Sequence, residues 1–339
     1  MKTRKYFAAA NGYTGFRSYF DRIFDSRNFD GIYVLKGGPG TGKSTLMKNI
    51  AKESIKRGYL HEEIYCSSDP SSLDGVTVES EKGRFAILDG TAPHERDAVF
   101  PGVIDCIVNL GESFIIEILK ARRDEILSLC ESKRREYKAA YEVLHSAERV
   151  NSRIKGLLKA SLKTATASSL LLRERRSEDA SNPQGKVMLK RAFCKSGYYE
   201  LEDFIYDGER VKISGDYDKS LILLNFMHNN LRQTCRLVSY DPLDEGMCDA
   251  FFDGHSTVFA SNGKIDSDSQ IDAEEFFTEP QSKEETDTLL CARDNLLGLA
   301  TKHFLIASTL HAELESIYSS AMNFDHNATL LEKIINNIF

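Results

Sequence analysis

The pattern of apolar and polar positions predicts alternating strands and helices in the first third of the chain. The run GIYVLK (Gly31–Lys36) is short and mostly apolar, which is typical of a buried parallel strand. Helical spacing then extends from Lys43 to Arg57, and Gly58 follows where glycine commonly ends a helix. The apolar stripe of this helix consists of Leu46, Met47, Ile50, Ala51 and Ile55. Together with the later runs EEIYCSS and RFAILDG, this order indicates an α/β fold with a doubly wound parallel sheet.

The pattern changes to long, highly charged helices at about residue 111 and keeps this character to about residue 176. Apolar residues recur there near helical spacing, at Leu119, Ile126, Leu129, Tyr137, Ala140, Tyr141 and Leu144. This spacing predicts a helical hairpin or a coiled-coil arm. The segment that follows, ERRSEDASNPQGK, is polar and contains Asn-Pro and Gly, so it is predicted to be a linker.

Beyond this linker the first half of the chain recurs in outline. KRAFCKSGYYELEDFI matches RKYFAAANGYTGFRSYF, and VKISGDYDKSLILL matches YVLKGGPGTGKSTLM after a two-residue deletion. VSYDPLDEG matches CSSDPSSLDG, and ARDNLLGL (residues 292–299) matches RRDEILSL (residues 122–129). Four matches in one order indicate a tandem duplication.

Composition and charge narrow the range of functions. The 339 residues are enough for two domains, and 41% hydrophobic with 28% charged residues is typical of a globular protein. A net charge of -7 argues against binding of nucleic acid or membrane by the whole molecule. Residues 117–176, however, hold 15 Lys or Arg against 8 Asp or Glu. An acidic protein or a nucleic acid is therefore a candidate partner for the basic arm, at Lys133, Arg134, Arg135 and Lys138.

The cysteines and the apolar runs bear on the cell compartment. Seven cysteines are scattered and form no CxxC pair, so we expect reduced thiols and no zinc knuckle. No apolar run approaches the length of a membrane span, and the N-terminal sequence lacks a signal-peptide core. We expect a cytoplasmic protein that does not bind membranes.

A phosphate-binding motif follows the GIYVLK strand. GGPGTGKS (residues 37–44) fits the pattern GxxxxGK[ST] in full, between an apolar strand and an amphipathic helix as the motif requires. Glycines let backbone N–H groups approach phosphate oxygens, and the helix directs its positive end at the same anion. Lys43 is expected to reach the β- and γ-phosphates, and Ser44 to ligate Mg²⁺. The predicted nucleotide contacts, for ATP in preference to GTP, are Gly37, Gly38, Pro39, Gly40, Thr41, Gly42, Lys43, Ser44 and Thr45.

A further ligand for Mg²⁺, in addition to Ser44, is predicted at the end of the strand FAILD, and it is a carboxylate. Asp89 ends this run, 46 residues after Lys43, which suits a Walker B carboxylate that acts with Ser44 on the metal. Asp89 is followed by Gly90, where many hydrolytic ATPases carry a glutamate that polarises water. The catalytic base must then lie elsewhere, or hydrolysis is slow.

Four side chains are candidates for that role. Asp69 ends the second strand, where many P-loop kinases of small molecules carry their base, and Asp74 lies five residues further on. His94 and Glu95 follow the third strand and could face the γ-phosphate. Asp-Pro and Asp-Gly pairs also make ordinary turns, and His94 could simply hold its loop together.

The second copy of the motif has lost its phosphate-binding chemistry. SGDYDKS keeps Lys219 and Ser220 but replaces the glycines, and Asp216 and Asp218 add negative charge. Opposite Asp89 the alignment gives Ser261 or Asn262, neither of which is a carboxylate. We predict that this half binds no nucleotide or binds it weakly.

The segments KGGPGTGKS, CSSDPSSLDG and LDGTAPH resemble a family of uncharacterised bacterial ATPase-like proteins with two tandem P-loop halves. The resemblance implies ATP binding and supplies no substrate. In that family both halves can carry an intact P-loop, so the loop at residues 216–220 departs from it. The predicted fold is thus an α/β P-loop NTPase, tandemly duplicated, with a helical arm. Its predicted parts are a nucleotide-binding domain (1–110), the arm and linker (111–180) and a degenerate second half with C-terminal helices (181–339).

Three functions fit these features. The first is an ATPase or ATP-dependent switch, in which Mg-ATP at the first half drives rearrangement against the second half and the arm. The second is a small-molecule kinase with Asp69 as general base. The third, a nucleotide-gated binding module that uses the basic arm, ranks lowest because charged helix faces are usually only solvated.

Overall fold

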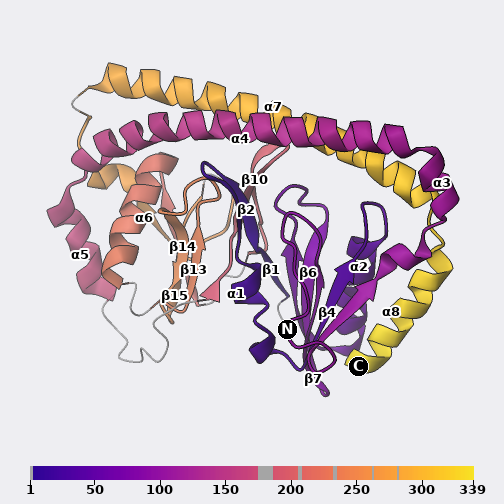
Figure 1. Cartoon of the computed structure of the whole chain (residues 1–339). Coiled ribbons are helices and arrows are strands. Elements are labelled where there is room, and N and C mark those ends of the chain that lie inside the picture. Colours follow the sequence, from indigo (N-terminus) through magenta and orange to yellow (C-terminus); the bar gives the residue numbers. More distant parts are fainter. Residues whose placement is uncertain (1–2, 175–185, 205–207, 232–234, 262, 281) are drawn as a thin grey trace.

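The structure, a computed structural model, describes residues 3–174, 186–204, 208–231, 235–261, 263–280 and 282–339. Two α/β halves lie side by side, and two long helices run across both (Figure 1). The predicted linker, residues 174–186, falls almost entirely outside the described residues. No helix in the described ranges is both long enough and apolar enough to cross a bilayer.

The first half contains a six-stranded mixed sheet. Its order is β1 (Arg4–Phe7), β5 (Leu60–Tyr65), β6 (Leu73–Ser80), β7 (Gly83–Asp89), β4 (Gly31–Lys36), β8 (Asp105–Asn109). All neighbours are parallel except at β6, which runs antiparallel to both β5 and β7. The prediction of a wholly parallel sheet is therefore wrong at this strand. The connections on either side of β6 are too short for a parallel crossover, so they can only close hairpins.

The second half contains a sheet with the same order. From one edge it runs β9 (Lys186–Val187), β13 (Leu237–Tyr240), β14 (Cys248–Phe252), β15 (Ser256–Ala260), β12 (Glu209–Ser214), β16 (Ser269–Asp272). Here β14 is the antiparallel strand, at the position that β6 occupies in the first sheet. Shared order and a shared antiparallel position support the predicted duplication of α/β domains.

The helix after the central strand begins and ends where the sequence predicts. It is α2 (Lys43–Arg57), and Gly58 closes it in a left-handed conformation with φ 77°. Leu46, Met47, Ile50 and Ala51 are buried, but Ile55 is 59% exposed and Ser54 takes its predicted buried place. In the second half the equivalent helix is α6 (Tyr217–Leu231).

Each half also has a two-stranded hairpin, and the two hairpins define which residues are equivalent. In β2 (Ala9–Gly12) and β3 (Gly15–Ser18), Ala9 pairs with Ser18. In β10 (Arg191–Cys194) and β11 (Gly197–Glu200), Arg191 pairs with Glu200. Ala9 therefore corresponds to Arg191, and the turn residue Tyr13 corresponds to Lys195.

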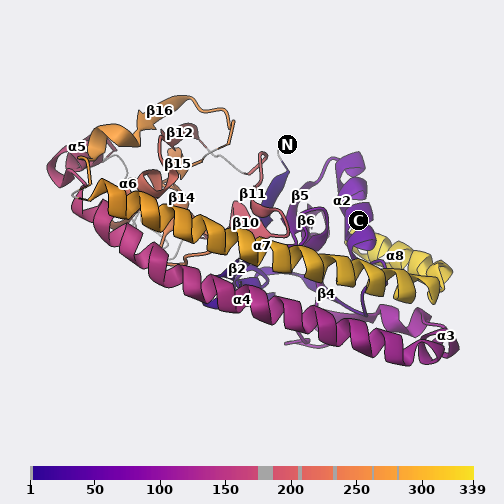
Figure 2. The ribbon, with the colours of Figure 1, turned by 90° about the horizontal axis from the view of Figure 1, so that it is seen from above.

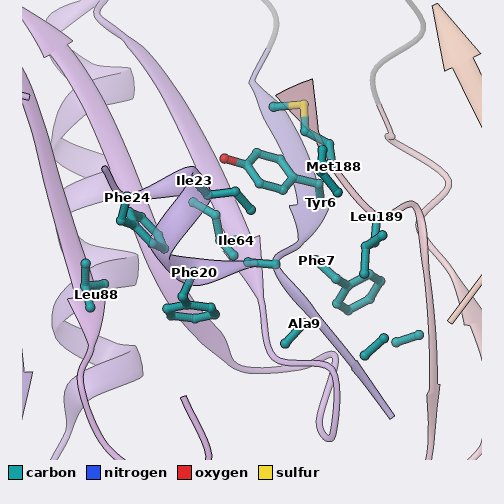
Figure 3. Close-up of a cluster of buried hydrophobic side chains, with 14 of the residues drawn as sticks. Tyr6, Phe7, Ala9, Phe20, Ile23, Phe24, Ile64, Leu88, Met188 and Leu189 are labelled. Carbon is teal, nitrogen blue, oxygen red and sulfur yellow. The ribbon is translucent and has the colours of Figure 1, made fainter. Parts of the chain in front are cut away.

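The two halves meet along a shared apolar core. Phe7 and Leu189, which precede the hairpins at equivalent positions, exchange two backbone hydrogen bonds of 2.8 and 3.1 Å. Around this bridge Tyr6, Phe20 and Phe24 of the first half pack with Met188 of the second (Figure 3). Phe7 and Leu189 are equivalent residues of the two halves and bond to each other. The two halves are therefore related locally by a pseudo-twofold axis.

The long helices come one from each half. α4 (Arg123–Ala160) and α7 (Lys283–Ser320) each have 38 residues and lie antiparallel, side by side (Figure 2). Arg153 pairs with Glu285 near one end, and Lys133 contacts His311 near the other. The predicted hairpin or coiled-coil arm is thus a helix pair whose second member comes from the second half of the chain.

The helices that follow this pair are exchanged between the halves. After α4, Leu162 bridges Phe277 and α5 (Thr164–Glu174) packs against α6. After α7, Met322 bridges Phe114 and α8 (Phe324–Ile338) packs against α2. These bridges equate Leu162 with Met322, which places residue 122 opposite residue 282. The fourth sequence match, which set residue 122 opposite residue 292, is therefore out of register.

Short helices complete the connections. They are α1 (Phe20–Ile23), η1 (Ser26–Asn28), η2 (Leu110–Ser113), α3 (Ile116–Ala121) and η3 (Ala273–Phe276). η2 and η3 occupy equivalent places after β8 and β16, and each begins at a side-chain cap, Asn109 or Asp272. Since Lys36 pairs with Asn109 and Ser214 with Asp272, the ends of the two central strands correspond.

Candidate functional site

A glycine-rich loop connects the central strand β4 to α2. Gly37, Gly40 and Gly42 have φ of 152°, 69° and 85°, values that side chains rarely allow. Gly42 directly precedes α2, and within the described structure the backbone amides of residues 40–44 donate no hydrogen bond to protein acceptors. Several free N–H groups and a positive helix end therefore converge at one point, which is a favourable environment for an anion.

Lys43 is the side-chain cation of this loop. Its Nζ donates to the carbonyl oxygens of Gly37 at 2.8 Å and Gly38 at 2.9 Å. The same Nζ lies 3.7 Å from Asp89 Oδ2 at the end of β7. Both side chains are at least 86% buried, so their attraction is weakly screened. The structure thus brings together the predicted cation and the predicted metal-binding carboxylate.

The other predicted residues of the loop have distinct environments. Thr41 Oγ1 donates to the Gly38 carbonyl oxygen at 2.9 Å and so closes the loop internally. Ser44 Oγ accepts the N–H of Leu73 at 3.0 Å, at the start of β6. Pro39 is partly buried, and Thr45 is exposed on the first turn of α2.

Asp89 keeps one carboxylate oxygen available. Its Oδ1 accepts from the backbone N–H of Thr91 at 2.9 Å and from Thr91 Oγ1 at 2.6 Å. Oδ2 faces Lys43 at a distance longer than a hydrogen bond. At Gly90 an added Cβ would lie 2.4 Å from Val34 Cγ1, so the position has no room for the glutamate that many hydrolytic ATPases carry there.

His94 connects two carboxylate-bearing residues. Its Nδ1 lies 3.1 Å from the Asp89 carbonyl oxygen, and its Nε2 lies 3.3 Å from Asp74 Oδ2. Each ring nitrogen therefore faces an oxygen of one of these two residues. Burial alone would lower the pKa of His94, but the hydrogen bond and charge of Asp74 outweigh it and raise the pKa. The ring also stacks on Phe20 at 4.3 Å, so His94 holds the loop together and has no nitrogen left for a water molecule.

Asp69 is bound by a residue that sequence reasoning missed. Its Oδ1 accepts from Ser71, and its Oδ2 accepts from Lys195 Nζ at 3.0 Å. Burial raises the pKa of Asp69, but Ser71 and Lys195 lower it more, so the net pKa is below its ordinary value. Lys195 belongs to the hairpin turn of the second half. The backbone N–H of its counterpart Tyr13, in the first half, donates to the carbonyl oxygen of Leu243 in the second half at 2.9 Å. Each half is thus completed by the hairpin of the other.

The last turns of α7 and the start of α8 cover the glycine-rich loop. A Cβ on Gly40 would lie 2.4 Å from the Glu315 carbonyl oxygen, and Asn327 Nδ2 donates to the Thr41 carbonyl oxygen at 2.9 Å. Beside them, burial and the charges of Lys133 and Lys43 lower the pKa of His311 to about 4. The neutral His311 Nδ1 therefore accepts from Lys133 Nζ at 3.2 Å.

The basic arm divides into inward and outward side chains. Lys133 faces His311, and burial lowers its pKa. Arg134, Arg135 and Lys138 are exposed on α4, and Lys138 lies 3.7 Å from Glu142 one turn away. Only three of the four residues predicted to meet an acidic partner are therefore on the surface.

The second half has no comparable loop. Only Gly215 and Asp216 separate β12 from α6, so Lys219 and Ser220 lie inside the first turn of the helix. Lys219 Nζ donates to Glu274 Oε2 at 2.5 Å, and Ser220 Oγ donates to the Ser214 carbonyl oxygen. The register of β12 with β15 places Ala260 at the position of Asp89, not Ser261, and Asn262 lies outside the described residues.

Comparison of the chain with protein-family models, with curated proteins and with solved structures gives no match. The resemblance to ATPase-like proteins with two P-loop halves therefore stays a prediction. Some residues near the site were not predicted from the sequence. Of these, Lys195 could have been noticed, since it lies in a segment that repeats in both halves. His311, Glu315 and Asn327 could not have been noticed, because only the exchange of helices brings them to the loop.

Proposed function

We propose that the first half is a P-loop NTPase domain that binds Mg-ATP at residues 37–45 and acts as an ATPase or ATP-dependent switch. One observation carries the proposal: free amides of residues 40–44, the end of α2 and Lys43 converge on one point. In this proposal residues 1–110 hold the nucleotide, 111–180 form the arm and 181–339 form a degenerate half. Backbone N–H groups that would otherwise lack acceptors could donate to phosphate oxygens. This favours an anion that has several such oxygens.

The same residues suit Mg²⁺. Asp89 Oδ2 and Ser44 Oγ are oxygen donors beside Lys43, and Mg²⁺ takes oxygen ligands from one or two protein groups, phosphates and water. The described residues contain no group of three or more His, Cys, Asp or Glu placed to hold a metal by themselves. A metal that binds together with phosphates fits such a donor set better than a resident ion does. Bound Mg²⁺ would neutralise negative charge on the phosphates.

Slow hydrolysis fits the site better than phosphoryl transfer from ATP to a small molecule with Asp69 as general base. A general base needs a pKa near the working pH, whereas Lys195 and Ser71 hold the pKa of Asp69 below its ordinary value. His94 has both nitrogens engaged, and Gly90 excludes a glutamate. Asp69, His94 and position 90 therefore supply no well-placed base, which is typical of a switch with a low turnover number.

The switch would act through contacts made by the second half. Glu315 on α7, Asn327 on α8 and Lys195 of the second hairpin all touch the loop or its neighbour Asp69. A ligand shifts a conformational equilibrium only if it contacts the two states differently. Groups of both halves surround the loop, so a nucleotide bound there would contact both halves. A change in the position of one half relative to the other would then change those contacts.

The test measures binding and turnover separately. Calorimetric titration of the full chain with Mg-ATP should give one site per chain, and phosphate release without any acceptor should be slow but measurable. Consumption of ATP only after addition of a metabolite pool would support the kinase instead. No binding at millimolar Mg-ATP would contradict the proposal altogether.

A further inference from the structure

The second half contains a cavity of about 390 Å³ at the carboxyl ends of its strands. Its lining residues come from the start of α6 and from α4 and α7, the two long helices that run along this half in Figure 1, so it occupies the place that the glycine-rich loop has in the first half. In open α/β sheets this end of the strands is the usual place for ligands, and the volume suits a small molecule. The position and size of the cavity therefore favour a binding site over a packing defect.

Arg191 is the unusual group in this cavity. Its guanidinium lies between the rings of Tyr198 and Tyr217, 4.2 and 4.3 Å from their centroids. The residue is only 4% exposed, yet its Nε and Nη1 have no hydrogen-bond partner among the described residues. The nearest carboxylate oxygen, Asp241 Oδ2, is 3.9 Å from Nη1, beyond hydrogen-bond distance. Buried donors of this kind are costly unless an acceptor completes them.

Most of the other charged side chains around the cavity form ion pairs with one another. Arg293 forms two hydrogen bonds with Asp218, at 2.7 and 2.9 Å, and Lys155 pairs with Asp244. Five aspartates and three basic residues line the cavity, so its excess charge is negative. Burial, together with the charge of Asp218, raises the pKa of Asp216, which indicates that this carboxylate lacks a sufficient cation nearby.

One wall of the cavity is apolar. It is formed by Leu221, Met247, Leu290 and Leu297, from α6, the loop before β14 and α7. Leu221 and Met247 are almost completely buried. A ligand that fills this part of the cavity gains by covering apolar surface.

We propose that this cavity binds a small zwitterion with an apolar body, of the class of the free amino acids. Its carboxylate would accept two hydrogen bonds from one edge of the Arg191 guanidinium, in the bidentate manner that guanidinium favours. Its ammonium group would lie toward Asp216 and Asp218, and its side chain along the leucines. A triphosphate is excluded, because several negative charges would meet an acidic cavity.

This inference does not rest on ATP binding by the first half. The cavity is lined by residues of β10, β11, α4, α6 and α7, of the loop before β14, and by Tyr13 of the first hairpin, and it includes none of residues 37–45. A failure of one proposal therefore leaves the other intact. The variant Lys43→Ala should bind the zwitterion as the wild type does.

The experiment is calorimetric titration of the full chain with single L-amino acids, each at up to about 10 mM. We expect saturable binding of one or more apolar amino acids, and Arg191→Met should weaken it about tenfold or more by removal of the carboxylate partner. Arg210→Met is the matched control, since Arg210 is an arginine of the same half, on β12, that pairs with Asp268 and does not line the cavity. Circular dichroism would establish that each variant is folded.

A second variant covers the case in which Arg191→Met does not fold. Leu290→Trp on α7 places a large ring in the cavity and leaves Arg191 intact, so it should abolish binding by occupying the space. Absence of binding to every amino acid would overturn the proposal. Equal affinity in Arg191→Met, or displacement of the amino acid by pyrophosphate in the Lys43→Ala background, would do so as well.

Discussion

The two halves share one scaffold but differ at the same connection. Between the central strand and its helix, the first half has six residues and the second has two. In the first half the helix begins at Lys43, with free amides before it. In the second half the helix begins at Tyr217, and Lys219 and Arg293 are paired with Glu274 and Asp218.

The difference teaches what an anion site requires beyond a cation. Lysine is kept in both halves, but in the second half the carboxylates of Glu274 and Asp216 already accept from the backbone N–H groups of Asp216 and Lys219. Once two residues are lost, the helix starts earlier and its lysine finds a carboxylate of the protein. In our proposal the second half still binds a ligand at this end of its strands, but through side chains such as Arg191 and not through backbone N–H groups.

The largest expected effect separates the two lysines. Lys43→Ala should weaken Mg-ATP binding about a hundredfold, which corresponds to about 2.7 kcal/mol, because it removes the cation beside the phosphates. Lys219→Ala should leave the affinity almost unchanged, since that side chain already pairs with Glu274. Calorimetric titration gives both affinity and stoichiometry. Two nucleotides per chain, falling to one in Lys219→Ala, would show that the short loop still binds.

A second comparison concerns two aspartates that follow equivalent strands, Asp69 after β5 and Asp241 after β13. Burial, opposed by Arg191 and assisted by Asp249 and Asp244, raises the pKa of Asp241 to about 6. The folded state then holds a proton that the unfolded chain releases near pH 3.8, so wild-type stability falls as pH rises from about 4 to about 6. Asp241→Asn does not titrate, and it should gain about 2 to 3 kcal/mol relative to wild type across this window.

Chemical denaturation at several pH values measures this gain, with Asp69→Asn as the control. The pKa of Asp69 is lowered, so its contribution to stability is lost as pH falls, the opposite direction. The effect there should be small, because the side chain is 40% exposed. Equal pH dependence in wild type and Asp241→Asn would contradict the assigned burial effect.

The smallest expected effect concerns the metal. Asp89→Asn should leave binding of ATP without metal largely intact and should reduce the gain that Mg²⁺ gives by about tenfold, or 1.4 kcal/mol. Its counterpart in the second half is Ala260, which has no carboxylate to lose. Titration with Mg²⁺ at fixed ATP makes the comparison, and identical curves for wild type and variant would remove Asp89 from the metal site.

The candidate site was predictable as far as it is local in sequence. Residues 31–58 form the strand, loop and helix at the predicted bounds, because burial period, glycine φ angles and the helix end are encoded by neighbours along the chain. The antiparallel strand β6 was missed, since its sequence begins in a segment that resembles a turn. Asp89 and Lys43 were predicted to belong to one site, and Lys43 Nζ lies 3.7 Å from Asp89 Oδ2.

The sequence by itself determined that the chain is a duplicated α/β protein, that one glycine-rich loop is intact and that its copy has decayed. Only the tertiary structure decided which half each hairpin and terminal helix completes. The reason is physical: two copies of one scaffold offer similar docking surfaces, so local patterns cannot choose between them. The choice is made by the 38-residue helices α4 and α7, which carry α5 and α8 across to the opposite half, and by the bridge between Phe7 and Leu189. Lys195 beside Asp69 and Arg191 in its cavity follow from that arrangement.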